Sequence, residues 1–141
     1  MNSVPAFSST LDSVVESADS AEESVRQFAL EAGFEESDQY FIGLAAREIL
    51  INAIKHGNRF DPKKKVGLSM SISRSNLIIE VTDQGEGFQL ESVPDPRLPE
   101  NLGRRSGRGV TMALAIMDEF SVDRNSPGGT HVRMAKRLPV I

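Results

Sequence analysis

The sequence has no cysteine among its 141 residues. This absence excludes disulfide bonds, cysteine-based zinc fingers and thiol catalysis, and it suits a reducing compartment. No apolar run approaches the length of about 20 residues that a membrane-spanning helix needs. The first ten residues, MNSVPAFSST, have neither the basic start nor the apolar core of a signal peptide. We therefore expect a cytoplasmic protein without a membrane partner.

An excess of basic residues is also missing, because 16 lysines and arginines stand against 20 aspartates and glutamates, which gives a net charge of −4. Proteins that bind nucleic acids usually carry a basic patch or stripe, so we expect no direct nucleic-acid partner. The chain has no internal repeat and no low-complexity linker. At this length a single hydrophobic core is the expectation, and we expect residues 1–141 to form one domain.

Two helices are predicted in the first half of the chain. Ser20 to Glu23 has the pattern of a capping box, apolar residues follow at helical spacing, and Gly33 is expected to end this first helix. Ser37 is expected to cap the second helix, which runs to about Gly57-Asn58. The segment before both helices, from Val4 to about Val15, has a weak pattern that allows one short strand.

Strands dominate the second half. KVGLSMSIS at 65–73 alternates strictly, and LIIEVTD at 77–83 follows after a short turn, which predicts a hairpin. Helical spacing resumes at Val110, and FSVDR (120–124) and THVRMAKR (130–137) close the chain as strands around the turn NSPGG. Strands joined by hairpins favour a mixed, mostly antiparallel sheet with helices on one face, which is an α+β sandwich.

The second helix carries EILINAIKHGN, in which two polar side chains interrupt the apolar face. At about 100° per residue, Glu48 and Asn52 fall in the arc of Phe41, Ala45 and Ile49. An unpartnered buried polar group costs about 1–3 kcal/mol, so either neighbouring protein groups or a ligand and its ion must satisfy the pair. A glutamate can accept a proton from an attacking hydroxyl or water, and an asparagine oxygen suits Mg²⁺.

Two glycine-containing motifs follow. In TDQGEGF, Asp83 ends a strand, and Gly85 and Gly87 either let the backbone approach a flat ligand closely or form a plain flexible loop. SGRGV opens a helix whose main-chain amides, freed by Gly107 and Gly109, form an anion site suited to phosphate, unless the glycines serve packing alone. Each motif is weak when it stands alone.

A long irregular segment separates these two motifs. Residues 89–106 lack periodicity and contain three prolines, and loops of this length inside a compact domain are often lids over a site. In PGGTHV, a hairpin turn explains the two glycines, whereas Thr130 offers a hydroxyl to a ligand in the alternative interpretation. The chain has neither a Walker A sequence nor a G-x-G-x-x-G after a strand, which disfavours P-loop and Rossmann nucleotide binding.

The motifs occur in one order: E-x-x-x-N with H-G-N, then D-x-G-x-G-F, then S-G-R-G, then G-G-T. This order resembles the GHKL ATPase superfamily, and residues 20–138 look most like the stand-alone anti-sigma factor serine kinases of the RsbW type. The resemblance implies a Bergerat-type two-layer α/β sandwich, a single histidine-kinase-like ATPase domain with its ATP lid at about 89–106, and ATP and Mg²⁺ as cofactors.

The resemblance also implies roles for individual residues. Glu48 matches the general base that activates the acceptor hydroxyl, and Asn52 matches the ligand of the Mg²⁺ that bridges the ATP phosphates. Asp83 matches the carboxylate that binds the adenine amino group. The other matched positions shape the adenine pocket or contact phosphate: Gly85, Gly87 and Thr130 near adenine, and Arg105, Gly107, Arg108 and Gly109 at the end of the lid, where the arginines either stabilise phosphate charge or only keep the lid soluble.

The implied function is an ATP-binding anti-sigma regulatory factor. It would phosphorylate a serine of an anti-anti-sigma (STAS-domain) protein, sequester a sigma factor and act as a homodimer. The alternative is a nucleotide-gated protein-binding regulator without kinase activity. Glu48 favours the kinase, because a module that only binds has no evident need for a base at that position. A third option is an ATPase or a fragment of a histidine kinase.

Overall fold

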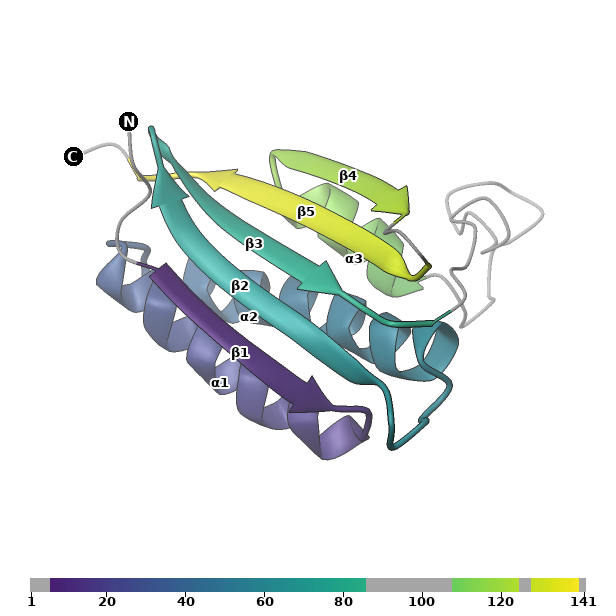
Figure 1. Cartoon of the computed structure of the whole chain (residues 1–141). Coiled ribbons are helices and arrows are strands. Elements are labelled where there is room, and N and C mark those ends of the chain that lie inside the picture. The colour runs from purple at the N-terminus through teal and green to yellow at the C-terminus, as the bar shows by residue number, and fades with distance from the viewer. Residues whose placement is uncertain (1–5, 86–107, 125–127, 140–141) are drawn as a thin grey trace.

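The helices of this protein lie together on one face of a single sheet, as Figure 1 shows for the computed structural model, which describes residues 6–85, 108–124 and 128–139. In these ranges the helices are α1 (Val15–Glu31), α2 (Glu36–Asn52), the five-residue π-helical turn η1 (Ala53–Gly57) and α3 (Arg108–Ile116). The strands are β1 (Ala6–Asp12), β2 (Lys65–Ser73), β3 (Asn76–Thr82), β4 (Glu119–Arg124) and β5 (Thr130–Arg137). The predicted α+β class is confirmed.

The five strands pair in the order β1-β2-β3-β5-β4, and each of these pairings is antiparallel. The boundaries of β2 and β5 agree with the strands predicted at 65–73 and 130–137. The register places Leu68, Val81 and Val132 side by side across β2, β3 and β5, and all three belong to the buried core. The apolar row that they form runs beside the end of β3, where the chain continues to Asp83.

The hydrophobic core lies between the sheet and the helices. Its completely buried large side chains include Ile42 and Leu50 of α2 and Ile79 and Met134 of the sheet. Burying one such side chain stabilises the fold by about 1.5–3 kcal/mol, so α2 is the central element of the helical layer. None of the helices in the described ranges is both long and apolar enough to cross a membrane.

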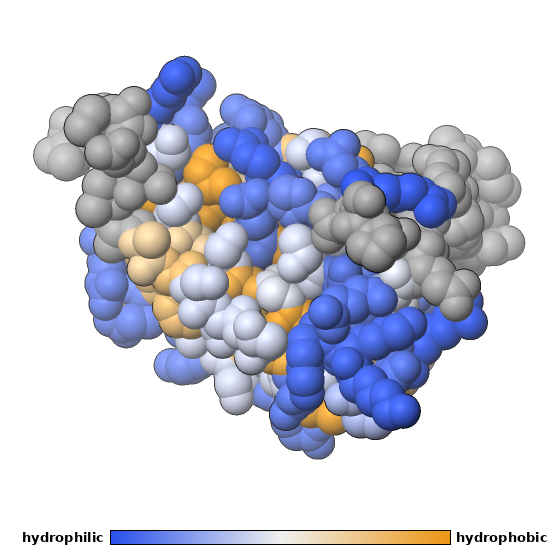
Figure 2. Space-filling model, in the orientation of Figure 1, coloured by the Kyte–Doolittle hydropathy of each residue, from blue (hydrophilic) through white to orange (hydrophobic). Residues whose placement is uncertain are grey.

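The other face of the sheet has no helix over it (Figure 1). Because side chains alternate between the two faces of a strand, Thr10, Ser69 and Ser71 lie on this uncovered face, opposite the core residues of β2. Figure 2 looks onto it and shows pale side chains of intermediate hydropathy gathered over the strands, with strongly hydrophilic ones around them. Ile78 and Ala135, which are paired in the register, are buried although they lie outside the core cluster.

Two predicted helix starts were wrong. Helix α1 begins at Val15, so the capping box predicted at Ser20 lies inside the helix. The early turns are held in the core by Ala18 and Ala21, whose small side chains gave little periodic signal. Helix α2 begins after Glu35, and Ser37 is therefore a residue of the first turn instead of the cap. The predicted stop of α1 is confirmed, because Gly33 follows it with φ +98°.

The buried face of α2 is rotated from the predicted one. Phe41 was expected to face the core, but 47% of it is exposed and its ring packs edge-on against Tyr40. The buried face includes Ile42 and Ile49, which are seven positions apart and share one side of the helix. Glu48 and Asn52 consequently lie at the margin of the core instead of within it, and both are half-buried.

Candidate functional site

A pocket opens at the end of the sheet where β3 stops and β5 begins. Its cavity volume is about 10 Å³, so the pocket is narrow in this structure. Most of the wall is apolar, and the polar side chains in it are Asn52, Asp83 and Thr130. Small-molecule sites commonly combine an apolar lining with a few convergent polar groups. The apolar lining comes from α2, η1, α3 and strands β3 to β5: Ile49, Ala53, Val81, Val110, Phe120, Val122 and Val132.

The carboxylate of Asp83 is buried and held in one orientation. Its Oδ1 accepts hydrogen bonds from the amides of Gly85 (3.0 Å) and Thr130 (3.1 Å), and only 4% of the residue is exposed. Burial raises the pKa of Asp83 above its usual value, although the two amides and the charge of Lys64 oppose this rise. The second oxygen, Oδ2, points toward Gly57 at the end of η1.

Three glycines allow the main chain to pack closely around Asp83. A Cβ on Gly57 would overlap Oδ2 of Asp83, and a Cβ on Gly85 would overlap the carbonyl oxygen of Gly57. Gly129 has φ +91°, and a Cβ there would overlap the carbonyl oxygen of Asp83. At each of these three positions, any side chain larger than hydrogen would therefore push the neighbouring main-chain segments apart. The three glycines therefore let the end of η1 and the residue before β5 pack directly on Asp83.

Thr130 contributes a buried hydroxyl without a partner. The residue is 2% exposed, and its Oγ1 has no hydrogen-bond partner among the described residues. Leaving such a group unsatisfied costs about 1–3 kcal/mol, and Thr130 is one of the residues that line the pocket. A ligand with a polar edge would satisfy it.

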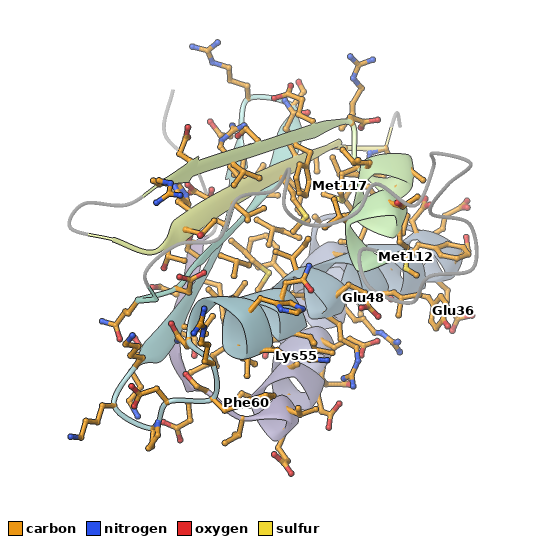
Figure 3. The ribbon with its side chains drawn as sticks, turned by 90° about the vertical axis from the view of Figure 1, so that its right-hand side faces the viewer. Glu36, Glu48, Lys55, Phe60, Met112 and Met117 are labelled. Carbon is orange, nitrogen blue, oxygen red and sulfur yellow. The ribbon has the colours of Figure 1, made fainter. Side chains whose placement is uncertain are left out.

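Glu48 lies one helical turn before Asn52, outside the pocket wall. Figure 3 shows Glu48 on α2, on the side of the molecule where Met112 of α3 lies. Helix α3 packs against α2 and begins at Arg108. Within the described ranges, no three histidine, cysteine, aspartate or glutamate side chains gather to hold a metal ion.

The structure brings together only part of the predicted site. Asn52, Asp83 and Thr130 line the pocket, the amide of Gly85 bonds to Asp83, and Glu48 is not among the lining residues. Several predicted positions lie outside the described residues: Gly87, Arg105, Gly107 and the proposed lid at 89–106. Arg108 and Gly109 open α3, and only their main chain is described.

Sequence reasoning missed the part that the end of the second helix plays in this site. Gly57 and Asn58 were interpreted mainly as a helix stop, but Gly57 packs on Asp83 and Asn58 is bonded to the neighbouring Gln84. The triplet H-G-N was the available signal. The apolar lining from α3 and β4 was also missed, because the spacing of apolar residues along the chain does not show which helices and strands pack together.

Comparisons with known proteins agree on one family. The profile of the histidine kinase-like ATPase domain matches residues 7–136. An anti-sigma F factor of Clostridium botulinum (strain Eklund 17B / Type B) is 31% identical over 101 residues, which cover 69% of each chain. The serine-protein kinase RsbW of Oceanobacillus iheyensis is 25% identical over 101 residues, which cover 67% of this chain and 63% of that protein.

A solved structure has the same fold. The crystal structure of the RsbU and RsbW domains of Rv1364c from Mycobacterium tuberculosis superposes with a TM-score of 0.69 and 23% sequence identity. The superposition covers 96% of this chain but 32% of that longer chain. It therefore identifies the fold of almost the whole chain, and at this identity it concerns the fold alone.

Proposed function

We propose an ATP-dependent regulatory function for this chain, which belongs to the histidine kinase-like ATPase family and, within it, to the anti-sigma factors. In this proposal it binds a sigma factor and transfers a phosphoryl group from ATP to a serine of an anti-anti-sigma (STAS-domain) protein. The observation that carries ATP binding is the pairing of a buried, oriented carboxylate on Asp83 with the orphaned hydroxyl of Thr130 in one apolar pocket.

The adenine base would occupy the Asp83 end of the pocket. Its exocyclic amino group would donate to Oδ2 of Asp83, since Oδ1 already accepts two main-chain amides. Ile49 and Val81 would lie against the flat faces of the ring, and Gly85 would hold the carboxylate of Asp83 in place through its amide. Guanine presents a carbonyl oxygen where adenine has the amino group, so the carboxylate would repel it. We therefore expect the site to prefer ATP to GTP.

The triphosphate would extend from this pocket toward α2 and the start of α3. Asn52 would offer its side-chain oxygen to Mg²⁺, which neutralises charge on the phosphates when it is bound. The amides at the beginning of α3 suit an anionic group, and we assign phosphate contacts to Arg105, Gly107, Arg108 and Gly109 and an adenine-pocket role to Gly87. These assignments rest on the family motif.

Glu48 would act as the general base. As the serine oxygen of the partner forms its bond to the γ-phosphorus, the bond to the β,γ-bridging oxygen breaks and ADP leaves. The serine proton would pass to the Glu48 carboxylate. Glu48 precedes Asn52 by one turn, so both project from the same side of α2, where the γ-phosphate would end.

Phosphoserine formation tests this function. The protein is incubated with Mg-ATP and a STAS-domain partner from the same organism, and the phosphoserine formed on the partner is quantified by mass spectrometry. We expect Glu48→Ala to abolish the modification. Glu36→Ala is the matched control, because this exposed glutamate lies at the other end of the same helix (Figure 3) and should not change it. Undiminished labelling by Glu48→Ala would contradict the assigned base.

The same experiment separates the kinase from a nucleotide-gated regulator. If wild type binds a sigma factor in an ATP-dependent way but produces no phosphoserine with any partner, the chain regulates through binding alone. In that case Asn52→Ala should abolish regulation and Glu48→Ala should leave it intact. ATP turnover without any protein acceptor would instead indicate a plain ATPase.

We also propose that the chain forms a homodimer. The sheet face that no helix covers is the surface that such a dimer would use, and Ser71 of β2 lies on it. Analytical ultracentrifugation measures the mass in solution. A monomer mass at all concentrations would contradict the proposal, and Ser71→Arg should weaken a dimer that uses this face.

A further inference from the structure

Asn58 is a polar residue that is almost completely buried, with 1% of its surface exposed. It follows the π-helical turn η1, and its side chain makes three hydrogen bonds. The Nδ2 group donates to Oγ of Ser13 (2.9 Å) and to the carbonyl oxygen of Lys65 (3.0 Å), and Oδ1 accepts from the amide of Gln84 (2.8 Å). Its amide protons and its carbonyl oxygen are therefore all used.

These bonds form a closed network around the segment that follows β3. The side-chain oxygen of Gln84 accepts a hydrogen bond from the amide of Lys65 (2.5 Å). Asn58, Gln84 and Lys65 are thus bonded in a ring, although they come from the end of η1, the end of β3 and the start of β2. The ring fixes the main chain of Gln84, which lies between Asp83 and Gly85.

The backbone around Asn58 adopts unusual conformations to place this side chain. Its amide donates to the carbonyl oxygen of Ala53 (2.8 Å), five positions earlier, as in a π-helix. Arg59 and Phe60 then have φ +52° and +60°, a region that residues with a Cβ rarely adopt. Such conformations persist only where surrounding contacts fix them, and they often occur at functional sites.

We infer that Asn58 is a positioning residue that holds the Asp83–Gly85 segment in the shape that recognises adenine. Its Oδ1 holds the amide of Gln84, while the carbonyl oxygen of Gly57 packs on Gly85, so the end of η1 fixes this segment at two adjacent points. Without the bond to Asn58, the Gln84–Gly85 main chain would lose one anchor, and the hydrogen bond from the amide of Gly85 to the carboxylate of Asp83 would weaken. This inference rests on the proposed ATP-binding function.

A purely structural role would give a different result. In that case the bonds to Ser13 and Lys65 would matter most, and loss of Asn58 would lower stability without changing the choice between bases. Ser13→Ala provides the matched control, because it removes the partner of one Nδ2 bond and leaves the bond from Gln84 to Oδ1 in place.

Isothermal titration calorimetry with ATP and with GTP tests the inference at a temperature where every variant is folded. We expect Asn58→Ala to weaken ATP binding at least tenfold and to lower the preference for ATP over GTP by a similar factor. Ser13→Ala should keep the wild-type preference, although it unfolds at a lower temperature. Unchanged ATP affinity and base preference in Asn58→Ala would overturn the inference, as would an equal loss of preference in Ser13→Ala.

Hydrogen exchange gives a second measurement that needs no variant. The exposed Gln84 should have a main-chain amide that exchanges at least tenfold more slowly than an open amide, because Oδ1 of Asn58 accepts it. Exchange at the open rate would overturn the inference even if Asn58→Ala fails to fold. Absence of ATP binding by the wild type would overturn the proposed function and this inference with it, whereas ATP binding with unaltered Asn58→Ala would overturn the inference alone.

Discussion

Asp83 and Thr130 are joined by two hydrogen bonds although 47 positions separate them in the sequence. The amide of Thr130 donates to Oδ1 of Asp83 over 3.1 Å, and the amide of Asp83 donates to the carbonyl oxygen of Thr130 over 3.0 Å. The antiparallel pairing of β3 with β5 places both residues at one end of the sheet. The carboxylate is therefore oriented before any ligand arrives, which lowers the cost of binding.

The pH dependence of stability should change in Asp83→Asn. Burial raises the pKa of Asp83 in the folded state above the ordinary value of 3.8. Between these two pKa values the folded state holds more protons than the unfolded state, so wild-type stability falls as pH rises through this window. The asparagine cannot ionise, and the variant should gain stability relative to wild type across the same window and keep a constant advantage above it.

Urea denaturation of both proteins from pH 3 upward measures this difference. Asp123→Asn serves as the control, because Asp123 is exposed on β4 and its substitution should give no comparable pH-dependent gain. If the difference in the free energy of unfolding between wild type and Asp83→Asn does not change with pH between the two pKa values, burial does not raise the pKa of Asp83.

Thr130→Val should stabilise the protein and weaken ATP binding at the same time. The substitution keeps the shape of the side chain and removes a buried hydroxyl without a partner, so we expect a gain of about 1 kcal/mol. Calorimetry should show a melting temperature about 4 °C higher and an ATP affinity several-fold lower. Thr130→Ser retains the hydroxyl and should keep most of the affinity. If Thr130→Val is less stable than wild type and binds ATP with unchanged affinity, the hydroxyl of Thr130 does not contact the ligand.

Gly85→Ala should disrupt the pocket. The added methyl group would overlap the carbonyl oxygen of Gly57, so the two segments must separate at a cost of about 1–3 kcal/mol, and ATP binding should be lost. Gly33→Ala is the matched control, since Gly33 has φ +98° but no atom within 4 Å of its would-be Cβ. It should lower stability by about 1 kcal/mol and leave ATP affinity intact. If Gly85→Ala and Gly33→Ala bind ATP with similar affinity, the packing of Gly85 against the carbonyl oxygen of Gly57 does not shape the ATP site.

Two neighbouring residues of α2 test which of its faces is buried. Phe41 is 47% exposed and Ile42 is completely buried. Phe41→Ser should therefore cost less than about 1 kcal/mol, whereas Ile42→Ala should cost about 2–5 kcal/mol. Chemical denaturation measures both losses of stability. A larger loss for Phe41→Ser than for Ile42→Ala would show that the buried face of α2 is the one predicted from the sequence.

The strands were predictable because their signal is local. In β2, Val66, Leu68 and Met70 alternate with small polar residues, and turn residues bound the segment on both sides. The turn with two glycines likewise marks the start of β5 at Thr130. Such patterns depend only on neighbours along the chain, and no knowledge of packing is needed to interpret them.

The helix faces were harder to predict, because packing decides them. Ala18 and Ala21 are buried in α1 but add little to a hydrophobic period, and Phe41 is apolar yet remains exposed. The helical spacing alone placed Phe41 and Ala45 in one buried arc, although only Ala45 faces the core. The exposed aromatic ring packs against Tyr40, a local contact that the period does not show.

The sequence singled out Asn52, Asp83 and Thr130 from short local motifs, and the structure places all three in the wall of one pocket. Asn52 ends α2, Asp83 follows β3 and Thr130 begins β5. The role of Asn58 was not predictable, because it depends on a π-helical turn and on bonds to residues from two other elements. Nothing in the local pattern distinguishes a π-helical turn from the end of an ordinary α-helix.

The π-helical turn also determines where this chain tolerates a change in length. Deleting one residue from 53–57 would restore ordinary helical spacing and rotate everything after it by about 100°, which would turn Asn58 away from the segment it contacts. The tight turn between β2 and β3 lies at the opposite end of β3 from Asp83. Insertions and deletions among relatives should therefore accumulate at that distal turn and avoid the junction between α2 and β2.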